Sequence, residues 1–265
     1  MVVWRGYLKL ILLLLIYGMA LALAPGPAQD KESGEAKALA AIQRAIDALG
    51  GKTFLQVRDI KSNGRYYQFR KGANTPGVVF QDSTRLPNKS RYEEGTKKKE
   101  KDITVFNLDI DKGWMLEGRK GVRDAKPEEV AQFKKTVKHA IENVLRTRYR
   151  ERGVKLFYFG PEEVAGKIRA EVVEILDQEN DSVLVYFDLK THLPVKLEYT
   201  ETAADGRKLK IEEEYTNWHN IEGVRTPMRI DVFTNGDQSS QRFVEKLSYS
   251  STFTDSLFEK PQPEK

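Results

Sequence analysis

Two stretches of the chain place apolar residues at the spacing of one face of an α-helix. The first spans residues 33–49, where apolar positions recur at intervals of three and four and predict one apolar stripe. Two glycines follow directly, and glycine is typical of a helix C-terminus, so we expect this helix to end at residue 49. The stripe consists of Leu39, Ile42, Ile46 and Leu49.

The second predicted helix spans residues 126–152. Pro127 suits the first turn of a helix, and the last turns are rich in arginine, which the negative end of the helix dipole favours. Gly153 ends the helix. Its apolar face consists of Val130, Phe133, Val137, Ile141, Val144 and Leu145.

Outside these helices the apolar positions follow the two-residue period of β-strands. Asn63-Gly64, Asp205-Gly206 and Asn235-Gly236 predict tight hairpin turns. The predicted strands before the second helix are 54–61, 64–71, 77–81, 90–94, 103–108 and 113–117. Those after it are 154–159, 167–176, 182–188, 194–202, 207–218, 226–234 and 240–249.

Consecutive strands with no helix between them form an antiparallel meander rather than βαβ units. Leu197, Tyr199, Leu209 and Ile211 alternate with charged residues, which indicates one wet and one apolar sheet face. A large sheet of this kind curls. We therefore predict a mainly β (α+β) fold: one strongly curved antiparallel sheet of about a dozen strands, with two helices on its apolar face.

The N-terminal residues have the pattern of a secretory signal peptide. Arg5 and Lys9 precede an apolar run over residues 10–24, and small residues and prolines follow to residue 28. The run is shorter than the roughly 20 residues of a membrane-spanning helix. We predict a cleaved signal over residues 1–28 and a single domain over 29–265; an uncleaved N-terminal anchor is the alternative.

Composition narrows the possible functions. The chain has no cysteine, which excludes disulfides, thiol nucleophiles and thiolate metal sites. Its formal net charge of +5 includes two cations of the predicted signal, so the remainder is nearly balanced and does not indicate nucleic-acid binding. Residues 97–101 are the densest basic run. They predict a solvated hairpin loop, with a transient contact to anionic membrane lipids as the alternative.

No pattern of catalytic or metal-binding residues is present. His139, His192 and His219 do not pair at metal-ligand spacing, so we expect structural or solvent-exposed roles, with His139 on the polar flank of its helix. There is no nucleophile elbow and no glycine-rich phosphate loop. We therefore predict a protein that is not an enzyme and needs no cofactor or metal.

Two acidic stretches resemble sites without completing them. Residues 109–113 begin like a calcium loop but lack the later ligands and the closing glutamate, so they predict a hairpin turn. Glu212, Glu213 and Glu214 lie in a predicted strand, which places two carboxylates on one face. Such a pair could act in acid–base chemistry, but a charged outer sheet face is the commoner arrangement.

The concave face of a curved half-barrel is the remaining candidate site. Small barrels of this kind either fill with side chains or hold a ligand. The aromatic and aliphatic residues predicted to line such a cavity could equally form a packed core. They are Trp114, Phe133, Ile141, Phe157, Phe159, Tyr186, Leu197, Tyr199 and Ile230.

Five short motifs carry a family resemblance. They are ALGG at residues 48–51, NLDIDKGW at 107–114, YFDLKTHLPV at 186–195, EGVRTP at 222–227 and DSLFEKP at 255–261. With these motifs the chain resembles the periplasmic lipoprotein-carrier superfamily, especially the outer-membrane lipoprotein-sorting proteins. The resemblance implies a periplasmic location and an incomplete β-barrel of about eleven strands, with the two helices as plug and lid. It also implies a cavity that holds acyl chains.

Two functions follow from this resemblance. The first is a non-catalytic carrier that binds acyl chains of a lipid or lipoprotein beneath a mobile lid at residues 126–152, with Phe133 and Ile141 on the lid face that touches the cavity contents. The second is a regulator on the same scaffold that binds an envelope protein partner. For either function we expect a monomer and no nucleic-acid partner.

Overall fold

The structure is a computed structural model that describes residues 32–70, 73–74, 76–95, 101–164, 166–203 and 205–261. The predicted signal peptide lies outside these residues, as does the basic run apart from Lys101. The Lys101 ammonium pairs with the Glu93 carboxylate, so this lysine contacts a neighbouring strand of the sheet.

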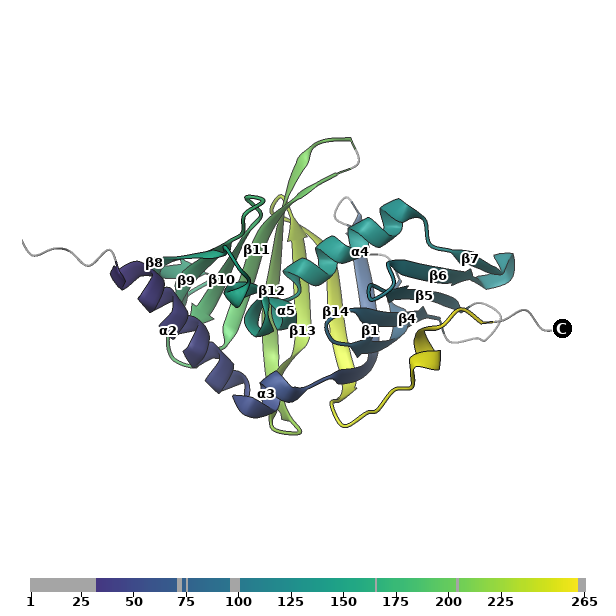
Figure 1. Cartoon of the computed structure of the whole chain (residues 1–265), viewed down its shortest axis with the longest axis horizontal. Coiled ribbons are helices and arrows are strands. Elements are labelled where there is room, and N and C mark those ends of the chain that lie inside the picture. Colours follow the sequence, from purple (N-terminus) through teal and green to yellow (C-terminus); the bar gives the residue numbers. More distant parts are fainter. Residues whose placement is uncertain are drawn as a thin grey trace, which may run out of the picture. The chain divides into compact units, whose positions relative to one another are not determined.

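One antiparallel sheet contains all the strands of the described chain (Figure 1). The strands before the second helical region are β1 (Asp59–Arg70), β2 (Ala73–Asn74), β3 (Val78–Arg85), β4 (Lys89–Glu94), β5 (Asp102–Asn107), β6 (Lys112–Glu117) and β7 (Val122–Asp124). Those after it are β8 (Lys155–Val164), β9 (Ile168–Leu176), β10 (Ser182–Asp188), β11 (Pro194–Thr202), β12 (Lys208–Ile221), β13 (Val224–Thr234) and β14 (Asp237–Ser248).

The order of the strands explains why the sheet is an incomplete barrel. Thirteen strands form the path β7-β6-β5-β4-β3-β1-β14-β13-β12-β11-β10-β9-β8, and β2 pairs beside β1. The first and last long strands meet in the middle, while β7 and β8 form the two ends and do not pair with each other. The mainly β, open-barrel prediction is confirmed, with thirteen strands in the path rather than about eleven.

Two of the three predicted hairpin turns lie where the sequence places them. Asn235 and Gly236, with φ of 53° and 88°, connect β13 to β14. The prediction for Asn63-Gly64 is wrong, because β1 runs straight through it with a register shift against β14. A Cβ at Gly64 would overlap the carbonyl oxygen of Phe243, so this glycine permits a close backbone approach at a bulge.

The main core lies between the sheet and the helices α2 (Glu32–Leu49), α3 (Lys52–Gln56) and α5 (Ile141–Arg146). Leu39 of the predicted stripe is 48% exposed. Alanine side chains occupy the buried face of α2 instead, and their small size lets α2 approach the sheet closely. The buried face of α2 consists of Ala38, Ala41, Ile42, Ala45, Ile46 and Leu49.

The second predicted helix is broken, which corrects the prediction of one continuous helix. It forms α4 (Pro127–His139), α5 and the 3-10 turn η3 (Arg148–Arg150). Ala140, between α4 and α5, has φ −57° and ψ 129°, which is extended backbone. The Asn143 side-chain amide donates to the carbonyl oxygen of Val137 at 2.9 Å. In a continuous helix a backbone N–H of the next turn would bond this carbonyl, so the side chain replaces that hydrogen bond.

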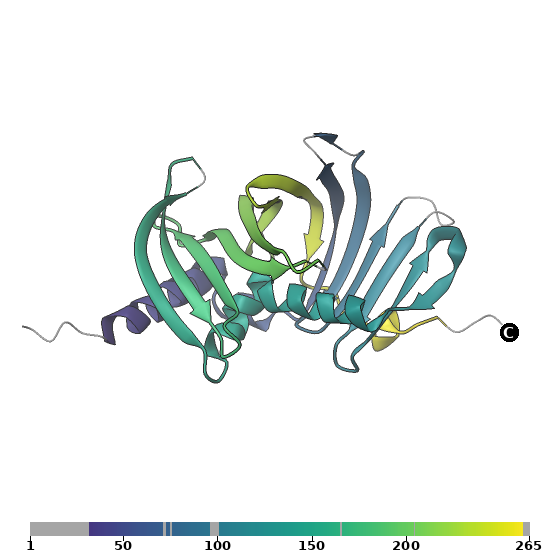
Figure 2. The ribbon, with the colours of Figure 1, turned by 90° about the horizontal axis from the view of Figure 1, so that it is seen from above.

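The C-terminal segment covers the other face of the sheet near β5 and β6. Trp114 of β6 packs against Val105 of β5 and against Phe258 of the short 3-10 turn η4 (Asp255–Phe258). The Trp114 indole N–H donates to the Phe258 carbonyl at 3.4 Å. Figure 2 shows the curl of the sheet, with α4 running from the side of β8–β11 toward the side of β4–β7.

Candidate functional site

The strand register brings one row of side chains together on the concave face of β4, β5 and β6. Ser90 lies opposite Phe106, and Tyr92 lies opposite Thr104, which lies opposite Met115. Residues directly opposite each other in an antiparallel pair project from the same face. These five side chains therefore form one continuous surface across three strands.

The helix α4 covers the aromatic end of this surface. The ring of Phe133 stacks on that of Phe106, with centroids 4.4 Å apart and an angle of 11° between the planes. Tyr92 stacks in the same way on Phe80 of β3 at 5.9 Å. Aromatic pairs of this geometry add to the stabilisation that comes from burial alone, so the contact with Phe106 holds α4 against the sheet.

The opposite end of the surface is acidic. Glu94 lies opposite Asp102, which lies opposite Glu117, so three carboxylates cross the strands in one row. Asp102 is four residues from Phe106 along β5, which at about 3.3 Å per residue separates the two ends by about 13 Å. The surface is therefore amphipathic, with aromatic rings beneath α4 and carboxylates away from it.

Between α4 and this surface lies a cavity of about 780 Å³, which we call the α4 hollow. Its volume is within the range of small-molecule binding sites. It is open to solvent, and its lining combines the aromatic and acidic ends described above. The lining residues are Ser90, Tyr92, Glu94, Asp102, Thr104, Phe106, Met115, Leu116, Glu117, Gly118, Lys120 and Phe133.

The packing of α4 is light compared with that of α2. Only Val130 and His139 of its residues are buried. Two further hollows, of about 650 and 520 Å³, are also lined by α4 residues, and both include Lys134. A helix with so little buried surface and open space around it is a cover on the sheet rather than part of the core.

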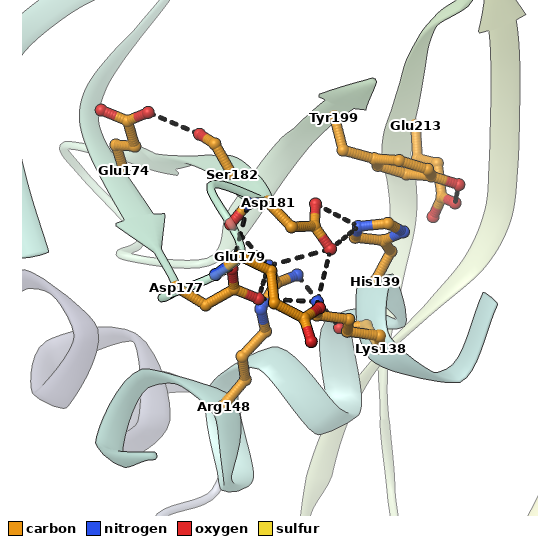
Figure 3. A network of polar contacts seen from close by, with 10 residues as sticks. All are labelled: Lys138, His139, Arg148, Glu174, Asp177, Glu179, Asp181, Ser182, Tyr199 and Glu213. Atoms are coloured by element: carbon orange, nitrogen blue, oxygen red, sulfur yellow. Dashed lines mark hydrogen bonds and ion pairs between the residues drawn. The ribbon is translucent and has the colours of Figure 1, made fainter. Parts of the chain in front are cut away.

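A polar network fixes the C-terminal end of α4 (Figure 3). The Nε2 atom of His139 lies 3.0 Å from the Asp181 carboxylate. The Lys138 ammonium contacts Asp177 at 2.6 Å, Asp181 at 2.9 Å and Glu179 at 3.2 Å. All three carboxylates belong to the turn between β9 and β10, so this turn and the end of α4 are joined by charge-assisted hydrogen bonds.

Two buried side chains complete the network. Arg148 of η3 is almost fully buried and donates to the backbone carbonyls of Asp181 at 3.0 Å and Lys138 at 3.3 Å. The His139 ring stacks on Tyr199 of β11 at 4.1 Å. Because each partner comes from a different element, the network ties α4, η3 and the sheet together at one point.

The charges of this network stabilise one another. Burial raises the pKa of the Asp181 carboxyl, but hydrogen bonds with His139 and Lys138 outweigh burial and hold the pKa well below its usual range. Burial also raises the pKa of the Asp177 carboxyl, but the hydrogen bond with Lys138 helps to outweigh burial, so the pKa is lowered. Burial lowers the pKa of Lys138, whereas its carboxylate partners raise it above the usual range. Both aspartates and Lys138 are therefore charged at neutral pH.

The N-terminal end of α4 is held by contacts nearer to solvent. Glu129 accepts hydrogen bonds from Arg123 at 2.8 and 2.9 Å and from the Lys126 backbone N–H at 2.7 Å. Both contacts lower the pKa of Glu129, to about 2, and the Arg123 guanidinium has a larger effect than the Lys126 N–H. Lys134 pairs with Asp111 at 2.7 Å, and both side chains are about half exposed. Exposed pairs of this kind contribute little to stability.

Glu213 lies on the core face of its strand, opposite to the face that carries the pair Glu212 and Glu214. It lies opposite Leu197, a residue of the concave core. It accepts a hydrogen bond from the Tyr215 hydroxyl at 2.7 Å. Burial raises its pKa, and the negative charge of Glu142 adds to that effect. Figure 3 shows Glu213 beside Tyr199, close to the network at the end of α4.

Five of the nine predicted cavity residues lie on the concave side. Phe133 lines the α4 hollow. Leu197 and Tyr199 are buried in the main core, and Ile141 and Ile230 pack against it. Tyr199 also lines the 650 Å³ hollow. Four of these five residues therefore contribute to packing, whether or not they also meet a ligand.

The other four predicted cavity residues lie elsewhere. Trp114 is on the outer face beneath the C-terminal segment, because it pairs with Val105 while Phe106 points the other way. Tyr186 belongs to a separate cluster with Val172 and Val195. Two aromatic residues of β8 are exposed: Phe157 by 41% and Phe159 by 56%. Contact between a ligand and any of the nine residues stays a prediction.

His139 and its aspartate partners are the residues that sequence reasoning missed. His139 was expected on the polar flank of its helix, but its side chain is buried. The break at Ala140 ends α4 beside the β9–β10 turn, where Asp181 and Tyr199 enclose the ring. In the sequence, the only indication of this contact is a cationic helix end that is followed, some forty residues later, by an acidic turn.

The described residues contain neither a metal cluster nor a spanning helix. No three of their His, Asp or Glu side chains gather closely enough to hold a metal ion. Of the helices in the same part of the chain, none combines the length and apolar character needed to cross a bilayer.

Comparison with solved structures identifies the fold. A DUF1329 family protein from Desulfovibrio piger matches with a TM-score of 0.57 and 13% identity, over 84% of this chain and 97% of that one. A LolA superfamily protein from Nitrosomonas europaea matches at 0.56 and 14%, over 84% and 97%. A putative outer membrane lipoprotein-sorting protein domain from Vibrio parahaemolyticus matches at 0.54 and 9%, over 86% and 96%.

These likenesses are structural. No protein-family model matches the chain, and no curated protein matches its sequence. The structural neighbours have the LolA-like open barrel that the sequence motifs indicate, so the resemblance is confirmed at the level of the fold.

Proposed function

We propose that this protein is a non-catalytic periplasmic carrier that binds an acyl chain of a lipid or lipoprotein in the α4 hollow. The observation that carries the proposal is the hollow itself, which has aromatic rings at one end and a lightly packed helix as its cover. The chain would reach the periplasm through the predicted signal peptide and would meet membranes only transiently.

The dimensions of the hollow support a single acyl chain. The separation of about 13 Å between the aromatic and acidic ends accommodates a chain with its head group toward the carboxylates. Each methylene removed from water contributes about 0.8 kcal/mol. Eight buried methylenes would therefore supply about 6 kcal/mol, enough for reversible binding with no covalent step.

The attachment of α4 supports its role as a lid. Its C-terminal end is fixed by the network around Asp181, whereas its N-terminal half rests on the Phe106–Phe133 stack, on the buried Val130 and on ion pairs nearer to solvent. Displacing that half would open the hollow and leave the core intact. Of the two lid residues predicted to touch the cavity contents, we retain Phe133, because Ile141 lies beyond the break in the main core.

Uptake of a fluorescent monoacylglycerol tests the proposal, because its neutral head group is not repelled by the three carboxylates at the acidic end of the hollow. A Phe133→Asp variant should bind the probe at least tenfold more weakly, since a charge beside an acyl chain costs at least about 1.4 kcal/mol. The matched control is Lys135→Asp, which also introduces a carboxylate on α4 but lies outside the hollow. Circular dichroism should first show that both variants fold.

Failure of the wild-type protein to bind the probe, or equal binding by both variants, would contradict the carrier proposal. A regulator that binds an envelope protein would then be the better interpretation. The 650 Å³ hollow beside α4 favours that second function, because its charged lining suits a polar peptide better than an acyl chain. Lys135, Glu198, Glu201 and Lys208 are among its lining residues.

A further inference from the structure

Among the described residues, the strand β8 is a free edge that differs from the other end of the sheet. It has ten residues, whereas β7 at the opposite end has three. Only one side of β8 pairs with a strand in the described chain, namely β9. An unpaired strand edge carries a row of free backbone N–H and C=O groups that can pair with another strand.

The sequence of β8 divides this edge into two halves. In the second half, Gly160 has a φ of 85° beside a register shift, and Pro161 follows. A bulge and a proline both discourage further strand pairing. In the first half, residues 155–158 pair regularly with β9, and the outward-facing Phe157 is 41% exposed; Phe159, at the register shift that ends this half, is 56% exposed. The unprotected half is therefore also the apolar half.

The inward-facing side chains of the first half of β8 are fixed by packing and hydrogen bonds. Leu156 is buried in the core, and the Tyr158 hydroxyl donates to Glu171 at 3.3 Å. Glu171 is also paired with Arg44 of α2 at 2.8 Å. Because these contacts hold the strand in an extended form, a partner strand would add to a preformed edge and would lose less conformational entropy.

We propose that this edge binds the same edge of a second copy of the chain, in an antiparallel arrangement centred on Phe157. The two-fold axis would place the two Phe157 side chains opposite each other. It would also bring Lys155 of each copy close to Phe159 at the bulge of the other, which is a cation–aromatic pair. A symmetric interface of this kind uses one patch twice.

The charges along β8 select the antiparallel direction. The exposed cation Lys155 begins the strand, the exposed Arg152 lies in the turn three residues before it, and the exposed carboxylates Glu162 and Glu163 lie toward the end of the strand. Antiparallel pairing brings each cationic start beside an acidic end, while parallel pairing would bring like charges together. The dimer revises the expectation of a monomer and is independent of the proposed carrier function.

Cysteine cross-linking tests the register, because the chain contains no other cysteine. The purified Phe157→Cys variant should form a disulfide-linked dimer under mild oxidation, since residues opposite each other across two strands approach within disulfide range. Lys155→Cys and Phe159→Cys should each dimerise poorly alone and cross-link to each other when mixed. Lys190→Cys, at an exposed position in another turn, gives the rate of random collisions.

A charge exchange provides a second measurement with folded, cysteine-free protein. Sedimentation should show concentration-dependent dimers of the wild type. Arg152→Glu alone and Glu162→Lys alone should each weaken association at least tenfold, because residues 152 and 162 face each other across the two-fold axis, while a mixture of the two variants should restore it as a heterodimer. Cross-linking of Phe157→Cys no faster than Lys190→Cys, or a wild type that stays monomeric at millimolar concentration, would overturn the proposal.

Discussion

Replacing Asp181 by alanine should destabilise the protein far more than replacing its neighbour Glu179. Both carboxylates contact the Lys138 ammonium, at 2.9 and 3.2 Å. The Asp181 side chain is 23% exposed and also holds His139, whereas the Glu179 side chain is 83% exposed. The two alanine variants therefore each remove a contact with the same lysine, and the two contacts differ in how deeply the carboxylate is buried.

The expected magnitudes follow from that difference. Removing one partner of a buried charged pair costs about 3–5 kcal/mol because the other charge is left behind. Since Asp181 retains some exposure, we expect the free energy of unfolding to fall by about 3 kcal/mol, which lowers Tm by about 6–12 °C in a chain of this size. For Glu179→Ala the expected loss is below about 1 kcal/mol, as for other exposed ion pairs.

Urea unfolding followed by circular dichroism at pH 7 measures both losses. The pH dependence adds a separate check. Because the folded-state pKa of Asp181 is lowered, its contribution is fully present above the unfolded value near 4 and disappears as the pH falls through the folded pKa. The gap between wild type and Asp181→Ala should therefore narrow in acid. Equal losses for the two variants at pH 7 would refute the reasoning.

Three further predictions concern other parts of the fold. Gly64→Ala should lower the free energy of unfolding by more than about 2 kcal/mol, measured by urea unfolding, because its Cβ would overlap the Phe243 carbonyl. Trp114→Ala should expose the C-terminal segment to limited proteolysis near Phe258 and destabilise by about 3–5 kcal/mol. Leu39→Lys should leave Tm nearly unchanged, whereas Ile42→Lys should abolish folding; equal effects on Tm would contradict the assigned face of α2.

The order of strands and helices could be predicted because it depends on short-range patterns. Alternating apolar residues located most strands, and turns such as Asn235-Gly236 located hairpins. The error at Asn63-Gly64 has a physical origin. The same dipeptide suits a tight turn and a bulge, and only the approach of Phe243, far away in the chain, decides between them.

The face on which a side chain lies was harder to predict. Trp114 and Phe106 are both aromatic residues in neighbouring strands, yet they lie on opposite faces, because Trp114 pairs with Val105. A shift of one residue in register exchanges the two faces. The register itself depends on long-range pairing, so the list of cavity residues mixed inner positions with outer ones.

The break after His139 connects the fold to the proposed opening of the hollow. Local sequence favours a continuous helix through Ala140, but the contacts of His139 and Arg148 with the β9–β10 turn require the chain to change direction there. A helix that ended in solvent would have no fixed axis about which to move. Here the buried end supplies that axis, and the Phe133 stack is the contact that must separate. The lid should therefore open from its N-terminal half, so an acyl chain that displaces Phe133 from Phe106 can enter while the network around Asp181 stays closed.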